Sequence, residues 1–284
     1  MTTEVVVITG GASGFGRALG ECCAERGHQV ALLERDGERA EAEAEAFTRT
    51  HGVAAIGLTV DVTDDGSVRA AADAVLDRFG RADVVISNVG VQLFGAVERL
   101  TDAEWRWVLD ANVIGAARTV RAFLPALRDA PAGRLAFTLS SSVLDPAARM
   151  AAYQASKFAL LGLAETLRLE LRDDGITVTA VFPSGMASRH LETSAAAQPD
   201  ELRRDIGEPA DFEAMVASNP GMVQAVCSPE EAARNVIDDL LDGVPYAITH
   251  GDLVGPLGSR HDRLHRAATK ATKATEAGLR ARNR

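Results

Sequence analysis

Near its N-terminus the chain reads Glu4-Val5-Val6-Val7-Ile8-Thr9-Gly10-Gly11-Ala12-Ser13-Gly14-Phe15-Gly16. The β-branched run before Thr9 is typical of a strand buried on both faces, and the residues from Arg17 to Arg26 predict a helix. A strand, a glycine turn and a helix in this order can bind phosphate, because glycines let the backbone come close and the helix N-terminus offers free N–H groups. A glycine-rich turn without a ligand is the alternative, and the flanking elements argue against it.

The rest of the chain alternates short apolar runs with helical patterns. Strands are predicted at about 29–33, 53–60, 83–87, 134–139, 176–182 and 246–249, and helices at about 37–50, 64–79, 102–128, 151–173 and 229–241. This alternation predicts an α/β fold, a Rossmann-type doubly wound parallel sheet of about seven strands with helices on both faces. Ligands of such sheets bind at the carboxyl ends of the strands. The segment 189–226 is polar, and we expect it to be irregular.

Tyr153 and Lys157 stand four residues apart in the predicted helix that starts near Ala151. Residues i and i+4 share one helical face, so the phenol and the ammonium are expected to project together. A neighbouring positive charge favours phenolate and lowers the pKa of a tyrosine, which would let the pair exchange a proton with an alcohol or carbonyl oxygen. Because Tyr-x-x-x-Lys also occurs by chance on helices, its weight depends on the glycine turn upstream.

Together the two motifs resemble those of the short-chain dehydrogenase/reductase superfamily in its compact, single-domain form. That family's active-site motif is Tyr-x-x-x-Lys, and its glycine motif is Thr-Gly-x-x-x-Gly-x-Gly. The latter is matched by Thr9, Gly10, Gly14 and Gly16, with Ser13 and Phe15 inside the turn. The resemblance covers about residues 4 to 250. It implies that the glycine turn holds the pyrophosphate of a nicotinamide coenzyme.

Composition and charge agree with this class of protein. Hydrophobic residues make up 46% and charged residues 25% of the 284 residues, as in an ordinary globular protein, and a net charge of −10 makes nucleic acid an unlikely partner. No run approaches the length of a membrane span, and the N-terminus lacks the basic region of a signal peptide. Cys22, Cys23 and Cys227 suggest reduced thiols, so we expect a cytoplasmic protein without a membrane partner. We predict one domain over 1–258, with a lid at about 186–226, and a basic, helical tail over 259–284.

The end of the second predicted strand, Leu32-Leu33-Glu34-Arg35-Asp36, bears on the choice of coenzyme. An acidic side chain here accepts hydrogen bonds from the ribose hydroxyls and repels a 2′-phosphate. In the resembled family, Glu34 stands where NAD-preferring members carry Asp, and Arg35 where NADP-preferring members often place a basic residue. We predict NAD, with NADP as the alternative, because Arg35 offsets the repulsion only in part. Arg35 could otherwise stack over the adenine or point to solvent.

The resemblance places further coenzyme contacts one position at a time. Asp61-Val62 matches the family's adenine contact, and Asn88-Val89-Gly90 matches Asn-Ala-Gly after the fourth strand, with Val89 in place of the usual Ala. After the sixth strand the family has Pro-Gly and then a Thr. Here the corresponding positions are Pro183, Ser184, Met186 and Ser188, in which Ser184 replaces the Gly and Ser188 the Thr.

The resemblance also supplies two further catalytic positions. Asn112 matches the asparagine of the family's catalytic tetrad, where it would anchor a water next to Lys157; a purely structural asparagine is the alternative. Ser140 stands 13 residues before Tyr153, which is the family's usual spacing for the catalytic serine. Ser142 is the alternative, because Ser142-Val143 also resembles a form of that motif.

The implied activity is hydride transfer between NAD and a secondary alcohol or ketone. Tyr153 would take the alcohol proton, Ser140 would bind the substrate oxygen and Lys157 would lower the Tyr153 pKa and hold the nicotinamide ribose. No metal is expected. The alternatives are an NADPH-dependent ketoreductase and a non-catalytic dinucleotide-binding regulator. The resemblance suggests a homotetramer or homodimer packed through the helices that contain Asn112 and Tyr153.

The substrate is expected to be a small apolar or cyclic molecule, because the residues predicted to surround it are mainly apolar. Residues after the fourth and fifth strands would line the pocket, and the predicted lid would close it. These residues are Val91, Gln92, Leu93, Phe94, Ser142, Val143 and Leu144, with His190, Met215 and Met222 in the lid.

Overall fold

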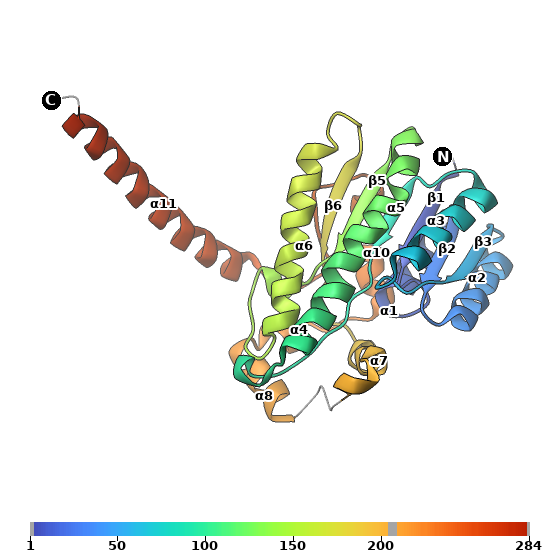
Figure 1. The fold of residues 1–284 in the computed structure, drawn as a ribbon, viewed down its shortest axis with the longest axis horizontal. Helices are drawn as coiled ribbons and strands as arrows, with labels where there is room; N and C mark the ends of the chain where they lie inside the picture. Colours follow the sequence, from blue (N-terminus) through green and yellow to red (C-terminus); the bar gives the residue numbers. More distant parts are fainter. Residues whose placement is uncertain (1–2, 204–208, 283–284) are drawn as a thin grey trace. The chain divides into compact units, whose positions relative to one another are not determined.

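The computed structural model describes residues 3–203 and 209–282, without the side chains of 222, 223 and 276–282 (Figure 1). It divides the chain into a compact unit that ends at His250 and a second unit that begins at Gly251. The predicted boundary lay a little later, between 258 and 259. The second unit contains one long helix, α11 (Val254–Arg282), where the sequence predicted a helical tail.

The first unit is built on a parallel seven-stranded sheet of order β3-β2-β1-β4-β5-β6-β7. The strands are β1 (Val5–Thr9), β2 (Gln29–Glu34), β3 (Ala55–Thr59), β4 (Val84–Ser87), β5 (Arg134–Thr138), β6 (Thr177–Phe182) and β7 (Tyr246–Ile248). The predicted Rossmann-type fold is thereby confirmed. The strand order reverses between β1 and β4, which pair with Val7 opposite Val85, so the coenzyme groove is expected at the carboxyl ends of these two strands.

Helices cover both faces of the sheet. On one face α1 (Gly14–Glu25) packs against α2 (Gly37–His51) and α10 (Pro229–Leu241). The helices α3 (Asp65–Phe79), α5 (Gly115–Asp129) and α6 (Ala151–Glu170) form the other layer, and α4 (Asp102–Leu109) lies beside α6 (Figure 1). Side-chain caps begin several of these helices, as in α4, where Thr101 and Glu104 form a capping box.

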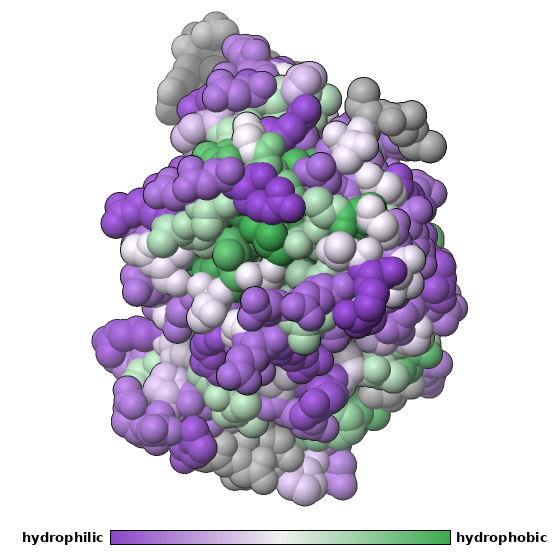
Figure 2. Space-filling model, turned by 90° about the vertical axis from the view of Figure 1, so that its right-hand side faces the viewer, coloured by the Kyte–Doolittle hydropathy of each residue, from purple (hydrophilic) through white to green (hydrophobic). Residues whose placement is uncertain are grey.

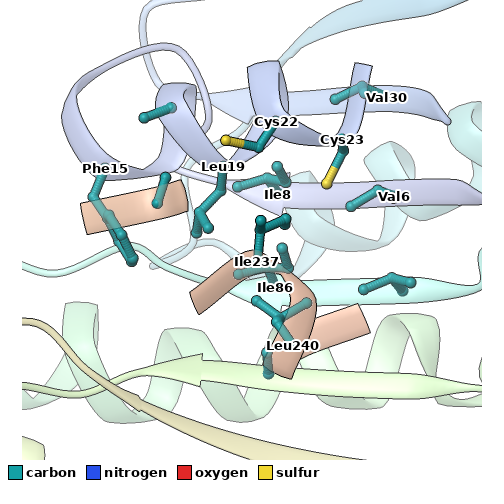
Figure 3. Packing of buried hydrophobic residues seen from close by; sticks show 14 of the residues in the cluster. Val6, Ile8, Phe15, Leu19, Cys22, Cys23, Val30, Ile86, Ile237 and Leu240 are labelled. Carbon is teal, nitrogen blue, oxygen red and sulfur yellow. The ribbon is translucent and has the colours of Figure 1, made fainter. Parts of the chain in front are cut away.

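The core under α1 explains why the N-terminal pattern is so apolar. Leu19 and Cys23 of α1 lie against Ile8 of β1, and Ile237 of α10 packs into the same cluster (Figure 3). All four side chains are fully buried. Two layers of helices and strands therefore exclude water from the element that carries the glycine turn, which holds that turn at the edge of the sheet.

The predicted helix over 102–128 contains a local change of geometry. Between α4 and α5 the residues Asp110–Ile114 form one π-helical turn, and Asn112 lies in its middle. Such turns inside α-helices are frequent at functional sites. The helix then continues through Pro125 to Asp129.

The prediction that 189–226 is irregular is wrong. The segment contains α7 (His190–Ala197), α8 (Pro209–Ser218) and α9 (Gly221–Gln224), and a 3₁₀ turn at Asp200–Leu202. These helices are short, and their apolar residues do not follow one clear helical period, so tertiary contacts decide their formation. Two further 3₁₀ turns, Val97–Arg99 and Ser141–Val143, follow β4 and β5.

The end of the sheet that carries β3 and α2 is shown in Figure 2, where hydrophobic residues gather within a hydrophilic surround. A depression of about 450 Å³ lies between α2 and β3, lined by Ala44, Ala55 and Ile56 together with Glu41 and Arg49. None of the predicted site residues lines it. In the part of the chain that the structure describes, no helix is both long and apolar enough to cross a membrane.

Candidate active site

The glycine turn leaves the start of α1 open to a ligand. Ser13 is the N-cap residue of α1, yet its side chain makes no capping hydrogen bond, so the backbone N–H groups of the first turn receive none from it. Gly14 has a φ of +50°, which favours glycine, and a Cβ there would come no nearer than 4.0 Å to Ser188. The Phe15 side chain points into the core, so only its backbone can serve a coenzyme. Free N–H groups at a helix N-terminus fit a pyrophosphate.

Asn88 ties three strands together at this edge. Its amide group donates to the carbonyl oxygens of Thr9 and Gly10, both at 3.2 Å, and accepts from the Thr138 hydroxyl at 3.0 Å. The Thr9 hydroxyl oxygen in turn accepts from the backbone N–H of Asn88 at 3.0 Å and of Val89 at 3.3 Å. The ends of β1, β4 and β5 are therefore held at fixed separations, so a coenzyme lying across them would meet a rigid floor.

Gly90, Asn112 and Lys157 meet just beyond β4. A Cβ at Gly90 would lie 3.0 Å from Lys157 Nζ and 3.8 Å from Asn112 Oδ1, so the absence of a side chain makes room for both groups. Asn112 is fully buried; it accepts from Val91 N at 2.7 Å and donates to Val91 O at 3.0 Å and Ser156 Oγ at 2.9 Å. Its side chain therefore fixes the loop after β4.

Tyr153 and Ser140 lie together as the sequence analysis expected. The two hydroxyls are hydrogen-bonded, which favours the phenolate, but burial is the larger effect and raises the pKa of Tyr153 to about 12. Lys157 was expected to lower this pKa, but it is not among the causes of the shift. Burial lowers the pKa of Lys157 to about 8, so the amine loses its charge well before Tyr153 titrates.

Lys157 is placed by a backbone group that the sequence analysis did not name. Its Nζ donates to the Thr138 carbonyl oxygen at 2.8 Å and lies 5.6 Å from the centroid of the Tyr153 ring. Thr138 is the last residue of β5, and nothing in its sequence context singles it out. The i,i+4 spacing brings the two side chains to one face, while the strand end determines where the ammonium lies.

The structure separates the two candidate serines. Ser140 begins the 3₁₀ turn after β5, where its hydroxyl oxygen accepts from the backbone N–H of Ser142 at 3.1 Å as well as bonding to Tyr153. Ser142 is fully buried, and its Oγ has no hydrogen-bond partner among the described residues. Ser140 is thus the serine that shares a hydrogen bond with the phenol.

At the end of β2, where the adenosine ribose is expected, the side chains of Glu34 and Arg35 have different partners. The Glu34 carboxylate accepts from the backbone N–H of Arg35 at 3.0 Å. The Arg35 guanidinium instead donates to the last carbonyl oxygens of α7, those of Ala196 at 3.1 Å and Ala197 at 3.4 Å. Its positive charge is therefore directed to the lid segment and away from the glycine turn.

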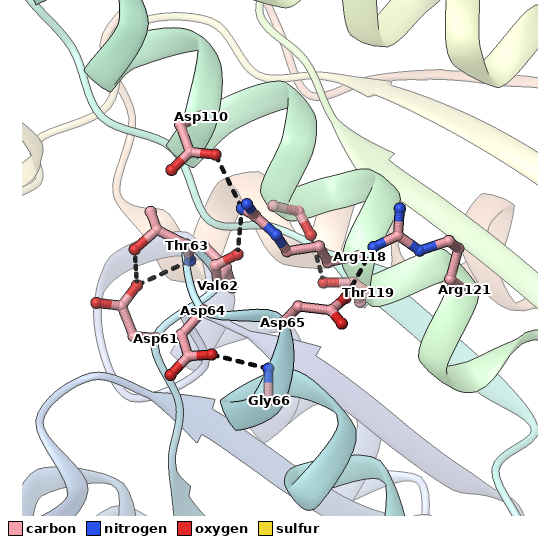
Figure 4. A network of polar contacts seen from close by, with 11 residues as sticks. Asp61, Val62, Thr63, Asp64, Asp65, Gly66, Asp110, Arg118, Thr119 and Arg121 are labelled. Carbon is pink, nitrogen blue, oxygen red and sulfur yellow. Dashed lines mark hydrogen bonds and ion pairs between the residues drawn. The ribbon is translucent and has the colours of Figure 1, made fainter.

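Asp61 and Val62 lie in a polar network that reaches the π-helical turn (Figure 4). The Asp61 carboxylate accepts from the backbone N–H and the hydroxyl of Thr63, at 2.8 and 2.7 Å. Arg118 donates both to the Val62 carbonyl oxygen at 3.2 Å and to Asp110 at 2.9 Å. The predicted adenine contact and the turn that carries Asn112 are thereby connected through one guanidinium.

The loop after β6 is held by a histidine that the sequence analysis did not assign to the site. His250 Nε2 lies 2.9 Å from the carbonyl oxygens of both Gly185 and Ala225, and its backbone carbonyl accepts from the Ser184 hydroxyl at 2.8 Å. The backbones of Met186 and Cys227 form an isolated parallel β-bridge. The side chain of Ser188 is the nearest group to a Cβ placed at Gly14. Pro183 is buried and accepts from Ser141 N at 2.8 Å. No sequence signal marks His250, because its partners are backbone groups from distant segments.

An apolar cluster adjoins the ring of Tyr153. Phe94, Met150 and Met215 are buried against the tyrosine ring, with Ala147 and Val216 packed on them. Of the pocket residues predicted from sequence, Phe94 and Met215 join this cluster, whereas Val91 and Leu93 pack against α4 instead. Val143 and Leu144 are buried, and the side chain of Met222 lies outside the described residues.

The lid helices bring one histidine and one carboxylate to this region. His190, half-buried at the start of α7, places its ring centroid 6.3 Å from that of Tyr153. Burial and the charge of Lys157 lower the pKa of His190 to about 4, so the imidazole is neutral at physiological pH. Asp211 of α8 is buried and pairs with Arg99 and Arg149, which anchors α8 beside Met150. Sequence analysis missed Asp211, whose role depends on contacts with two remote loops.

The comparison with known proteins agrees with this geometry. The family model of the short chain dehydrogenases matches residues 4–199. A protein from Streptomyces virginiae, named as a ketoacyl reductase of monensin polyketide synthase, is 36% identical over 202 residues, which cover 69% of this chain and 77% of that protein. Fluoren-9-ol dehydrogenase from Terrabacter sp. (strain DBF63) is 32% identical over 215 residues, 68% of this chain and 59% of that enzyme.

A solved structure extends the similarity to nearly the whole chain. The crystal structure of a short chain dehydrogenase/reductase from Burkholderia phymatum in complex with NAD has a TM-score of 0.84 at 27% identity, and the match covers 93% of this chain and 95% of that one. The chain therefore belongs to the short chain dehydrogenase family.

Proposed function

We propose that this protein is an NAD(P)-dependent oxidoreductase that transfers hydride between the coenzyme and a secondary alcohol or ketone. The observation that carries the proposal is the meeting of Ser140, Tyr153 and Lys157 at the carboxyl edge of the sheet, next to an uncapped helix N-terminus. A dinucleotide-binding regulator would have no need of this arrangement. The relative crystallised with NAD supports NAD as the coenzyme.

The residues present fit a nicotinamide dinucleotide. The open start of α1 would hold the pyrophosphate, Glu34 would accept hydrogen bonds from the adenosine ribose, and Lys157 lies where the nicotinamide ribose is expected. When bound, the coenzyme supplies the hydride acceptor or donor. The protein contributes position, exclusion of water and control of one proton.

The chain's own residues control that proton at the substrate oxygen. Ser140 and Tyr153 can both hydrogen-bond this oxygen, because the Ser140 hydroxyl already interacts with the Tyr153 phenol. In oxidation, Tyr153 as phenolate accepts the alcohol proton, and the ammonium of Lys157 stabilises the phenolate charge. Oxidation with NAD is the direction we propose.

One observation favours ketone reduction as the second candidate. Burial raises the pKa of Tyr153 to about 12, so the phenol keeps its proton at neutral pH and can donate it to the alkoxide that forms during reduction. The same residues serve oxidation and reduction, and the ratio of oxidised to reduced coenzyme determines the direction of the reaction.

The substrate that we propose is apolar and compact, with a cyclic secondary alcohol as the leading class. The side chains packed against Tyr153 are Phe94, Met150 and Met215, and an aromatic edge contact joins Phe94 to Phe212. Apolar ligands gain affinity from burial in such surroundings. Fluoren-9-ol, which is named in one relative, is a cyclic secondary alcohol of this kind.

The first test is to titrate the protein with NADH and with NADPH, following the nicotinamide fluorescence, and then to assay oxidation of fluoren-9-ol and smaller cyclic alcohols. Tyr153→Phe is expected to lower kcat by at least about a thousandfold while coenzyme binding persists. Ser140→Ala should also lower kcat strongly, whereas Ser142→Ala serves as the matched control. Full turnover by the Tyr153→Phe variant would refute the mechanism. Coenzyme binding without turnover of any alcohol or ketone would favour the dinucleotide-binding regulator, and absence of binding to either coenzyme would refute the enzymatic proposal.

A further inference from the structure

The helix α7 (His190–Ala197), which we call the strap, contacts the proposed coenzyme groove at three points. Its first residue, His190, lies beside Tyr153. In its middle, the Ser194 hydroxyl accepts from the backbone N–H of Gln92 at 3.0 Å, directly after the Asn88–Gly90 segment. At its end, the carbonyl oxygens of Ala196 and Ala197 accept from Arg35. These points correspond to the nicotinamide, central and adenosine parts of the groove, so the strap follows the path assigned to the coenzyme.

The contact at Arg35 is chemically well suited to hold the strap. The last carbonyl groups of a helix have no partner within the helix and carry the negative end of its dipole. The guanidinium of Arg35 donates to two of them from a point more than 160 residues away in the chain. A planar cation with several donors is the side chain best able to make both bonds at once.

Other contacts make the strap a single body. Ser194 is buried, and its hydroxyl donates to the His190 carbonyl oxygen at 2.7 Å. This bond links the middle of the helix to its first residue. Ala195 and Ala197 pack against the cluster of Val91 and Trp107. Loss of the Arg35 contact at the last turn should therefore also loosen the first turn, where His190 lies beside Tyr153.

We propose that Arg35 is the latch of this strap and thereby determines coenzyme affinity and specificity. The strap lies beside the Tyr153 ring and engages the Gln92 N–H and the Arg35 guanidinium along the proposed groove, so a coenzyme would bind only to the fraction of molecules in which the strap has moved away. The part of this proposal that concerns coenzymes rests on the proposed function. In this arrangement Arg35 has a partner other than a 2′-phosphate, and a coenzyme with that phosphate must compete with the strap for the same guanidinium.

The latch can be tested on the full-length protein without any coenzyme. Arg189 precedes the strap, and its side chain is 71% exposed, so trypsin can cut after it when His190 leaves Tyr153. Arg35→Met removes the two donated bonds while keeping the length of the side chain, and should speed this cut roughly fivefold, because proteolysis follows the population of the open form. Arg39→Met, which removes a nearby arginine at the start of α2, is the matched control and should leave the rate within about twofold.

A second measurement separates a latch from a direct coenzyme contact. If the strap competes with the coenzyme, Arg35→Met should bind NADH more tightly by about the same factor, because more of the protein is competent to bind. An unchanged cutting rate at Arg189, or weaker NADH binding by Arg35→Met, would overturn the latch. If no variant binds NADH or NADPH, the proposed function fails, and the cutting rate still decides whether Arg35 holds the strap.

Discussion

The Tyr153–Lys157 pair shows how burial changes the chemistry of a recognisable motif. Spacing alone suggests that the lysine lowers the tyrosine pKa, yet burial acts on both groups and moves their pKa values in opposite directions, to about 12 for the phenol and about 8 for the amine. Burial thus disfavours the charged form of each group, although Lys157 still carries its proton at pH 7. A bound coenzyme and substrate would bring polar groups into this site, so the proton affinity of the pair depends on its occupancy.

This burial leads to a stability prediction for Lys157. Its pKa is about 8 in the folded protein and 10.5 when unfolded, so between these values the unfolded chain binds more protons and stability rises with pH. From pH 7 to 9.5 the wild type should gain about 2 kcal/mol relative to Lys157→Met, which has no amine to titrate.

Urea unfolding of both proteins at the two pH values would measure this difference. Tyr153 does not interfere, because its raised pKa affects stability only above about pH 10 and with the opposite sign. A wild-type advantage that stays constant from pH 7 to 9.5 would show that the Lys157 amine is not desolvated in solution.

At the scale of elements, the π-helical turn between α4 and α5 connects three parts of the site. Asn112 in this turn holds the loop after β4. Asp110 at its start pairs with Arg118, which also donates to Val62 in the loop after β3. The turn thus fixes the loop after β4 through Asn112, whereas Asn88 fixes the ends of the strands β1, β4 and β5.

Removing the Asn112 amide should be costly. Asn112→Ala leaves the N–H and C=O of Val91 without a partner in a buried place, and should lower the free energy of unfolding by about 3 kcal/mol. Asn235→Ala, which loses one bond to the Thr249 carbonyl oxygen on an exposed part of α10, should cost about 1 kcal/mol or less. Chemical denaturation compares the two, and equal losses would contradict the positioning role of Asn112.

For the whole molecule, we propose self-association through the outer face of α6. Exposed small residues follow one another along this face at helical spacing, and a Cβ at Gly162 would touch nothing within 4 Å. The exposed residues are Ala155, Ala159, Gly162, Thr166 and Leu169. Small side chains let two helices approach closely. The family resemblance suggests a dimer or tetramer packed through this helix, which contains Tyr153, and through the helix that contains Asn112.

Gly162→Glu should therefore disrupt the assembly without unfolding the subunit. A buried carboxylate at a subunit interface costs several kcal/mol, or about a hundredfold or more in the association constant. Light scattering after size-exclusion chromatography would report the mass of each variant. Thr48→Glu, on an exposed part of α2, is the control and should leave the mass unchanged; an unaltered mass for Gly162→Glu would place the interface elsewhere.

Much of the architecture follows from the amino-acid sequence by itself. The apolar run before Thr9, the glycine turn and the alternation of strands and helices predict the parallel sheet. This works because the hydrophobic periodicity of a strand or helix, and the residues that begin and end it, are local features of the sequence. The i,i+4 spacing likewise places Tyr153 and Lys157 on one helical face. The helices within 189–226 escape this reasoning, since α7 and α8 depend on contacts with remote parts of the fold.

What only the tertiary structure decided are the properties that arise when distant segments meet. Ser140 is distinguished from Ser142 by which hydroxyl reaches Tyr153, and Arg35 is assigned to the strap by carbonyl groups more than 160 residues away. The roles of His250 and Thr138 depend on backbone groups, which carry no sequence signal. Local patterns encode periodicity, whereas pKa values and hydrogen-bond partners depend on burial and on the full set of neighbours, which only the folded chain brings together.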